Sequence, residues 1–114
     1  MITTWIQPIY TQNIYGSRYV RGYRANAIGL GIHQEVLQPL EPLGSSWTIT
    51  HIASGLNILP CTFADSEQAM RCVEELVLRF SNWQQPAKKL KKNKKLPEII
   101  RQAIEWAVNE IRVE

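Results

Sequence analysis

A stripe of apolar residues at helical spacing constrains the fold more than any other feature of the chain. Between residues 69 and 83, apolar side chains recur every three or four positions. Asp65 precedes this stripe and can accept hydrogen bonds from the free N–H groups of a first helical turn, with Gln68 at the capping-box position. Pro86 closes the pattern, because proline cannot continue a helix. The sequence therefore predicts an amphipathic helix over residues 65–84.

The first 60 residues predict strands. Residues 47–52 alternate, with Trp, Ile and His on one face and Thr, Thr and Ile on the other. Residues 28–33 alternate as well, and their two glycines leave one face open to a close neighbour, either backbone or an aromatic ring. Pro8 lacks an N–H group, so it confines the first strand to a sheet edge or a strand end.

A second helix is predicted over residues 97–113, after a lysine-rich linker at residues 86–96. Pro97 suits the first turn of this helix, and a broad apolar stripe follows it. A chain of 114 residues is one domain with one modest core. Strands followed by helices predict an α+β fold, in which an antiparallel sheet of three to five strands carries two amphipathic helices on one face.

All six lysines of the chain fall within residues 88–95. The formal net charge is +3, whereas seven arginines against ten acids leave the rest of the chain at −3. The basic character therefore comes from one segment. Such a segment could displace counterions from a nucleic-acid backbone and bind it without regard to sequence. The alternative is a solvated linker, since like charges repel one another and extend the chain.

The segment "RYVRGYR" (residues 18–24) interleaves arginines with tyrosines. On a strand, Tyr19, Arg21 and Tyr23 would share a face that could contact phosphates and stacked bases, or they could be ordinary residues of an exposed strand. The nucleic-acid-binding candidates are thus Arg18, Tyr19, Arg21, Tyr23, Arg24, Lys88, Lys89, Lys91, Lys92, Lys94 and Lys95.

Three hypotheses of function follow. The leading one is a small non-enzymatic nucleic-acid-associated protein, for example an accessory factor of a mobile element or phage. The second is a protein-interaction or assembly subunit, in which the helix at 97–113 meets a partner or a second copy through Ile99, Trp106 and Val113. The third places a small-ligand or hydrolytic site around His51, although its strand face also fits a packed histidine.

Catalytic and metal-binding signatures are not expected. The histidines and cysteines have no paired spacing that would shape a zinc site, and the hydroxyl and thiol groups lack an evident base. No enzyme activity, cofactor or metal is therefore predicted. No signal peptide or membrane-spanning stretch is recognised, and two cysteines outside a CxxC spacing favour a cytoplasmic protein with reduced thiols.

Residues 47–78, which include the stretch "WTITHIASGLNILPCTFADSEQAMRCVEEL", resemble integrase arm-binding domains and plant ethylene-response-type DNA-binding domains. The shared features are Trp47 opening a strand, Gly55 in a turn, Phe63 before the helix cap, and Ala69 six residues later. The resemblance implies a three-stranded sheet that enters the DNA major groove with a helix behind it. This chain departs from it, because residues 47–58 contain no lysine or arginine. Its basic contacts would have to come from the arginine–tyrosine strand and the lysines.

Overall fold

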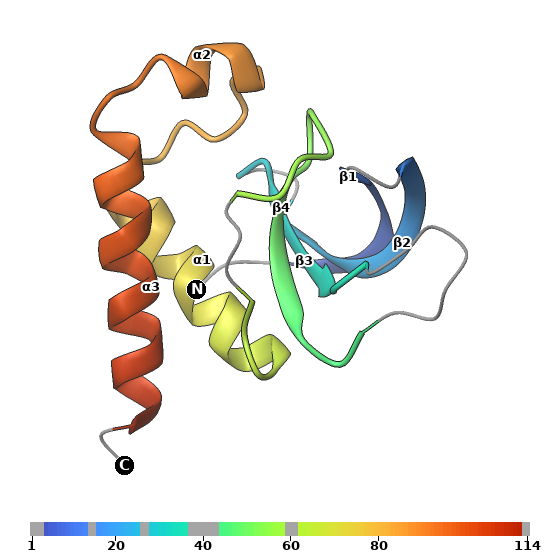
Figure 1. The fold of residues 1–114 in the computed structure, drawn as a ribbon, viewed down its shortest axis with the longest axis horizontal. Coiled ribbons are helices and arrows are strands. Elements are labelled where there is room, and N and C mark those ends of the chain that lie inside the picture. The colour runs from blue at the N-terminus through green and yellow to red at the C-terminus, as the bar shows by residue number, and fades with distance from the viewer. Residues whose placement is uncertain (1–3, 14–15, 26–27, 37–43, 59–61, 113–114) are drawn as a thin grey trace.

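The computed structural model describes residues 4–13, 16–25, 28–36, 44–58 and 62–112. Four strands come first and three helices follow (Figure 1). The elements are β1 (Trp5–Asn13), β2 (Gly16–Ala25), β3 (Leu30–Gln34), β4 (Trp47–His51), α1 (Ser66–Arg79), α2 (Ala87–Lys91) and α3 (Leu96–Arg112). The strands form one antiparallel sheet in the order β1-β2-β3-β4. The predicted α+β fold is confirmed.

The helices lie on the β3–β4 side of the sheet. Helix α1 packs against β3 and β4, and α3 runs along α1 (Figure 1). Leu30, Ile32 and Ile49 project from this sheet face into the same buried cluster as Val73 and Leu76 of α1. The alternation in β3 and β4 therefore sets which face receives the helix, because successive side chains of a strand point to opposite faces.

The opposite face of the sheet is also buried, because β1 and β2 curl over it (Figure 1). Ile9 of β1 is fully buried above two glycines, Gly22 of β2 and Gly31 of β3. A Cβ atom added to Gly31 would lie 2.9 Å from Ile9 Cδ1. The bare face predicted for residues 28–33 is thus filled by an aliphatic side chain at Gly31 and by backbone at Gly29, where an added Cβ atom would lie 2.8 Å from the Trp83 carbonyl oxygen.

Strand β1 is an edge of the sheet, as Pro8 predicts. The far end of β1 nevertheless reaches the turn that follows β4. The backbone N–H of Gln12 donates to the Gly55 carbonyl oxygen at 2.9 Å, and Gln12 Nε2 donates to the Ser54 carbonyl oxygen at 2.7 Å. These bonds hold the β1–β2 hairpin in its curled position.

Helix α1 begins as predicted. Asp65 is the N-cap, and its Oδ1 accepts from the Gln68 N–H at 2.8 Å. The helix ends at Arg79 and does not continue to residue 84, because Phe80 adopts extended backbone as the C-cap. Trp83 lies beyond the helix, buried edge-on against the Phe80 ring with the centroids 5.3 Å apart. The apolar spacing continued past residue 79 because Trp83 belongs to the core, not because it is helical.

Candidate functional site

The six lysines lie on a folded segment between α1 and α3, which we call the lysine segment (residues 87–97). Its first part is the short helix α2, and a turn leads from it into α3. In that turn the Asn93 N–H donates to the Leu90 carbonyl oxygen at 3.1 Å, and Asn93 Oδ1 accepts from the Lys95 N–H at 3.0 Å. The segment is therefore not the extended linker that like-charge repulsion predicted. Local hydrogen bonds hold it.

Two leucines anchor the lysine segment to the rest of the protein. Leu90 is 7% exposed and Leu96 is 6% exposed, and both belong to the main core cluster. The lysines at 88, 89, 91, 92, 94 and 95 are all exposed. Sequence reasoning missed these anchors because two leucines among six lysines give no periodic signal. As predicted, Pro97 lies in the first turn of α3.

The lysines differ from the helix arginines in their partners. Arg79 pairs with Glu75 at 2.8 Å along α1. Arg101 pairs with both Glu98 and Glu105 along α3, and its side-chain hydrogen bond lowers the pKa of the Glu98 carboxyl. None of the six lysines forms an ion pair with a described residue. The described part of the chain therefore leaves the positive charge of the lysine segment without ion-pair partners.

The arginine–tyrosine segment forms strand β2. Its five candidates for nucleic-acid binding do not share one accessible surface. Tyr19 and Arg21 are exposed on one face, with Tyr19 near the Tyr10 ring at a centroid distance of 5.4 Å. Tyr23 shares their face but is half-buried, stacked on Trp47 with ring centroids 6.0 Å apart.

The other two arginines of β2 fall on the opposite face, because side chains alternate along a strand. Arg18 and Arg24 are both half-buried, and Arg24 Nη1 donates to the Pro8 carbonyl oxygen at 2.9 Å. Of the five candidates on this strand, Tyr19 and Arg21 are thus the accessible pair.

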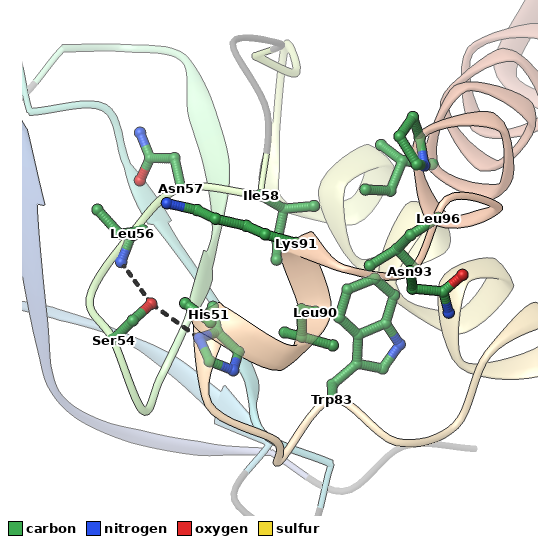
Figure 2. Close-up of a pocket in the computed structure, with 13 residues that line it drawn as sticks. His51, Ser54, Leu56, Asn57, Ile58, Trp83, Leu90, Lys91, Asn93 and Leu96 are labelled. Atoms are coloured by element: carbon green, nitrogen blue, oxygen red, sulfur yellow. Dashed lines mark hydrogen bonds between the residues drawn. The ribbon is translucent and has the colours of Figure 1, made fainter.

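A pocket of about 290 Å³ lies beneath the lysine segment (Figure 2). The turn after β4 forms one wall, and the lysine segment with the start of α3 forms the other. Its lining is mostly apolar, with polar groups at intervals. The lining residues are His51, Ser54, Leu56, Asn57, Ile58, Trp83, Ala87, Leu90, Lys91, Asn93, Leu96, Pro97 and Ile100.

His51 lies at the base of this pocket in a defined hydrogen-bond network. Its Nε2 lies 2.8 Å from the Gln85 carbonyl oxygen, which can only accept, so Nε2 carries the proton. Its Nδ1 therefore accepts from the Ser54 hydroxyl at 2.8 Å, and Ser54 Oγ accepts from the Leu56 N–H at 3.1 Å. Both ring nitrogens are occupied, and the ring is 2% exposed. The arrangement fits the packed histidine considered from the sequence, and it fastens the β4 turn to the residues before α2.

A second buried histidine lies inside the curled sheet. His33 Nδ1 is 2.7 Å from the Gln34 carbonyl oxygen, and His33 Nε2 is 2.6 Å from Thr50 Oγ1. Thr50 Oγ1 lies 2.9 Å from Asn57 Oδ1, so this polar chain runs from the sheet interior towards the pocket wall. Burial lowers the pKa of His33, because desolvation disfavours the charged ring. His33 is therefore a neutral structural group at pH 7.

Of the three residues predicted to form a protein interface on α3, the two that the structure describes are only partly exposed. Ile99 is half-buried and packs against the core. Trp106 is 38% exposed, and Val113 lies outside the described residues. Leu78 of α1, at 81% exposure, is a more exposed apolar side chain, and the sequence analysis did not single it out.

Neither a metal-ion cluster nor a membrane-spanning helix is found among the described residues. No group of three or more His, Cys, Asp and Glu side chains there could hold a metal ion. No helix in that part of the chain is both long and apolar enough to cross a membrane. Cys72 is a reduced cysteine, fully buried in the core.

The fold and site together define a small α+β protein with a curled sheet, a charged folded segment and a pocket beneath it. No protein-family model, no curated protein and no solved structure matches the chain. The described part of residues 47–78 contributes β4, single pairings at Asn57 and Phe63, and α1. Among its described residues it thus supplies one named strand, β4, to the four-stranded sheet.

Proposed function

We propose that this chain is a small non-enzymatic protein that associates with nucleic acid through its lysine segment. The observation that carries the proposal is the six exposed lysines without ion pairs to described residues, on a segment anchored by Leu90 and Leu96. Anchoring matters because charges held in place lose less conformational entropy on binding than charges on a free linker. The contact would be to phosphates and therefore independent of sequence.

Tyr19 and Arg21 support a second contact on the exposed half of the sheet. An exposed tyrosine can stack on an unpaired base, and the adjacent guanidinium can bind a phosphate. The other three candidates on β2 are less suited to contact nucleic acid, because their side chains are half-buried. They are Tyr23, Arg18 and Arg24, and Arg24 also donates a hydrogen bond to β1. A cytoplasmic location belongs to the same proposal and is supported by the reduced thiol of Cys72.

Salt-dependent binding tests the role of the lysines. Fluorescence anisotropy with labelled duplex and single-stranded oligonucleotides, repeated over a salt series, gives the slope of log K against log salt. Each lysine that contacts phosphate contributes about −0.9 to the slope on duplex and about −0.7 on a single strand. The double variant Lys88→Gln with Lys92→Gln should therefore bind more weakly and with a shallower slope.

A matched control uses the paired arginines. Arg79→Gln with Arg101→Gln lowers the net charge by the same amount but removes cations that already have carboxylate partners. We expect this control to keep most of the wild-type slope. Equal slopes for the two double variants would argue that only net charge matters, and the absence of binding at low salt would reject the proposal.

A second candidate function is assembly with a protein partner or another copy through α3. Trp106 is the observation that favours it, because a tryptophan at 38% exposure on an amphipathic helix is a typical interface anchor. In that case the lysine segment would act as a charged spacer. The two functions are compatible, since α3 and the lysine segment offer different surfaces.

A further inference from the structure

We propose that the pocket beneath the lysine segment binds a small amphipathic carboxylate. The carboxylate would lie at the opening beside Lys91, and the apolar chain would extend inward over the leucines and isoleucines of the lining. This inference concerns a different ligand from nucleic acid and stands whether or not the lysine segment binds phosphate backbones.

The apolar part of the ligand follows from the walls. Leu56 and Ile58 form the side contributed by the β4 turn, and Leu90, Leu96 and Ile100 form the side contributed by α2 and α3. Burying an aliphatic chain between such surfaces is favourable by about 25 cal/mol for each Å² removed from water. The volume of about 290 Å³ is near the lower end of small-molecule sites, roughly 300–1,000 Å³, so the ligand is short.

The polar part of the ligand follows from which lining groups already have partners. Three side-chain acceptors of the lining are used: Asn93 Oδ1 by the Lys95 N–H, His51 Nδ1 by the Ser54 hydroxyl, and Ser54 Oγ by the Leu56 N–H. The donors left without partners among the described residues and open to a ligand are the amide nitrogen of Asn93 and Lys91 Nζ. A lining with donors to spare selects a ligand rich in acceptors.

The indole ring of Trp83 forms part of the pocket lining. Trp83 is 1% exposed, and its Nε1 is buried without a hydrogen-bond partner in the described chain. A buried donor in this state costs about 1–3 kcal/mol. The nitrogen itself is out of reach of water, so a ligand would not bond to it, but the ring lines the pocket and makes the indole N–H a spectroscopic reporter there.

Lys91 decides the charge of the ligand. In Figure 2 its side chain extends across from α2 towards Leu56 and Asn57, on the opposite wall. It is the one lysine among the lining residues, and its five neighbours on the lysine segment add to the positive potential at the opening. An anionic head beside Lys91, with an uncharged chain below, matches this arrangement.

Octanoate is the probe that tests the proposal, with 1-octanol as its uncharged counterpart. In ¹⁵N-correlated spectra, octanoate should shift the Trp83 indole N–H saturably while the signals of Trp5 and Trp106 stay in place. Assignment comes from Trp→Phe variants of the other tryptophans. Octanol should bind up to about fivefold more weakly, the upper end of the range for one exposed ion pair.

Two variants on the same short helix separate the pocket from general charge. Lys91→Gln should weaken octanoate binding about fivefold, whereas Lys88→Gln, which removes an equal charge outside the pocket, should change it little. Ala87→Phe should fill the pocket and abolish binding, with circular dichroism confirming that the variant folds. Equal affinity for octanol, equal effects of the two lysine variants, or an unmoved Trp83 signal would each overturn the proposal.

Lipid vesicles form the last arm of the experiment. Binding to phosphatidylglycerol vesicles without any binding of monomeric octanoate would assign the lysines to an anionic membrane surface and refute the pocket. Binding of octanoate in solution, with phosphatidylcholine vesicles inert, would support a soluble carboxylate as the ligand.

Discussion

The close approach of β1 to the glycines of β2 and β3 makes a sharp prediction about stability. Gly31→Ala would bring a Cβ atom to 2.9 Å from Ile9 Cδ1 and 3.3 Å from the Tyr23 carbonyl oxygen. The nearest obstacle is thus the end of a side chain. We expect Gly31→Ala to lower the free energy of unfolding by about 1–2 kcal/mol, within the usual range for overpacking.

Gly22→Ala would bring its Cβ atom against backbone as well as side chains. Its Cβ atom would collide with the Ile32 carbonyl oxygen, as well as approaching Ile9 Cδ1 to 2.8 Å and His33 Cβ to 2.9 Å. Backbone cannot move without breaking the β2–β3 pairing, so we expect a loss of about 3 kcal/mol or more. For a chain of this size, each kcal/mol corresponds to a fall in Tm of about 4 °C.

Ile9→Val distinguishes the two cases, because it removes Cδ1 alone. By itself it should cost about 0.5–1.5 kcal/mol. Combined with Gly31→Ala it should recover about 1 kcal/mol, since the atom in the way has gone. Combined with Gly22→Ala it should recover much less, because the Ile32 oxygen remains. The assay is urea unfolding followed by circular dichroism, with all five variants measured at one pH. A Gly22→Ala protein as stable as Gly31→Ala, or no rescue of Gly31→Ala by Ile9→Val, would refute the curled packing of β1 over the sheet.

Two further predictions concern His33 and α3. The lowered pKa of His33 means that the unfolded chain takes up a proton near pH 6.5 while the folded chain does not. Stability should therefore be full above about pH 6.5 and fall as the pH drops from there towards the lowered pKa. Urea midpoints measured across this range should show the fall in the wild type and a smaller one in His33→Gln, and equal falls would exclude His33 as the cause. For assembly through α3, light scattering should find an oligomer that Trp106→Glu dissociates, and a monomer unchanged by the substitution would count against that function.

The candidate site was only partly predictable from the sequence. The lysine positions and the accessibility of Tyr19 and Arg21 were predictable from composition and strand alternation, but the pocket was not. Its lining comes from residues 51–58, from Trp83 and from residues 87–100, which have no shared spacing. The pairing of His51 with Gln85, 34 residues apart, likewise left no local pattern. A small-ligand site around His51 was one of three hypotheses from the sequence, and the structure adds a pocket at that place.

The sequence by itself determined the strand-rich first half and the two long helices of this protein, but not the short helix α2. The alternation at residues 47–51, the cap at Asp65 and Pro97 in a first turn act through neighbours along the chain, so local physics is enough to place them. Tertiary structure decided the rest. It ended α1 at Arg79 so that Trp83 could enter the core, folded Ile9 over Gly22 and Gly31, and fixed the lysines in place through Leu90 and Leu96. These outcomes depend on contacts between segments that are distant in the sequence. Burial of apolar surface stabilises such contacts, but they produce no periodic pattern from which they could be predicted.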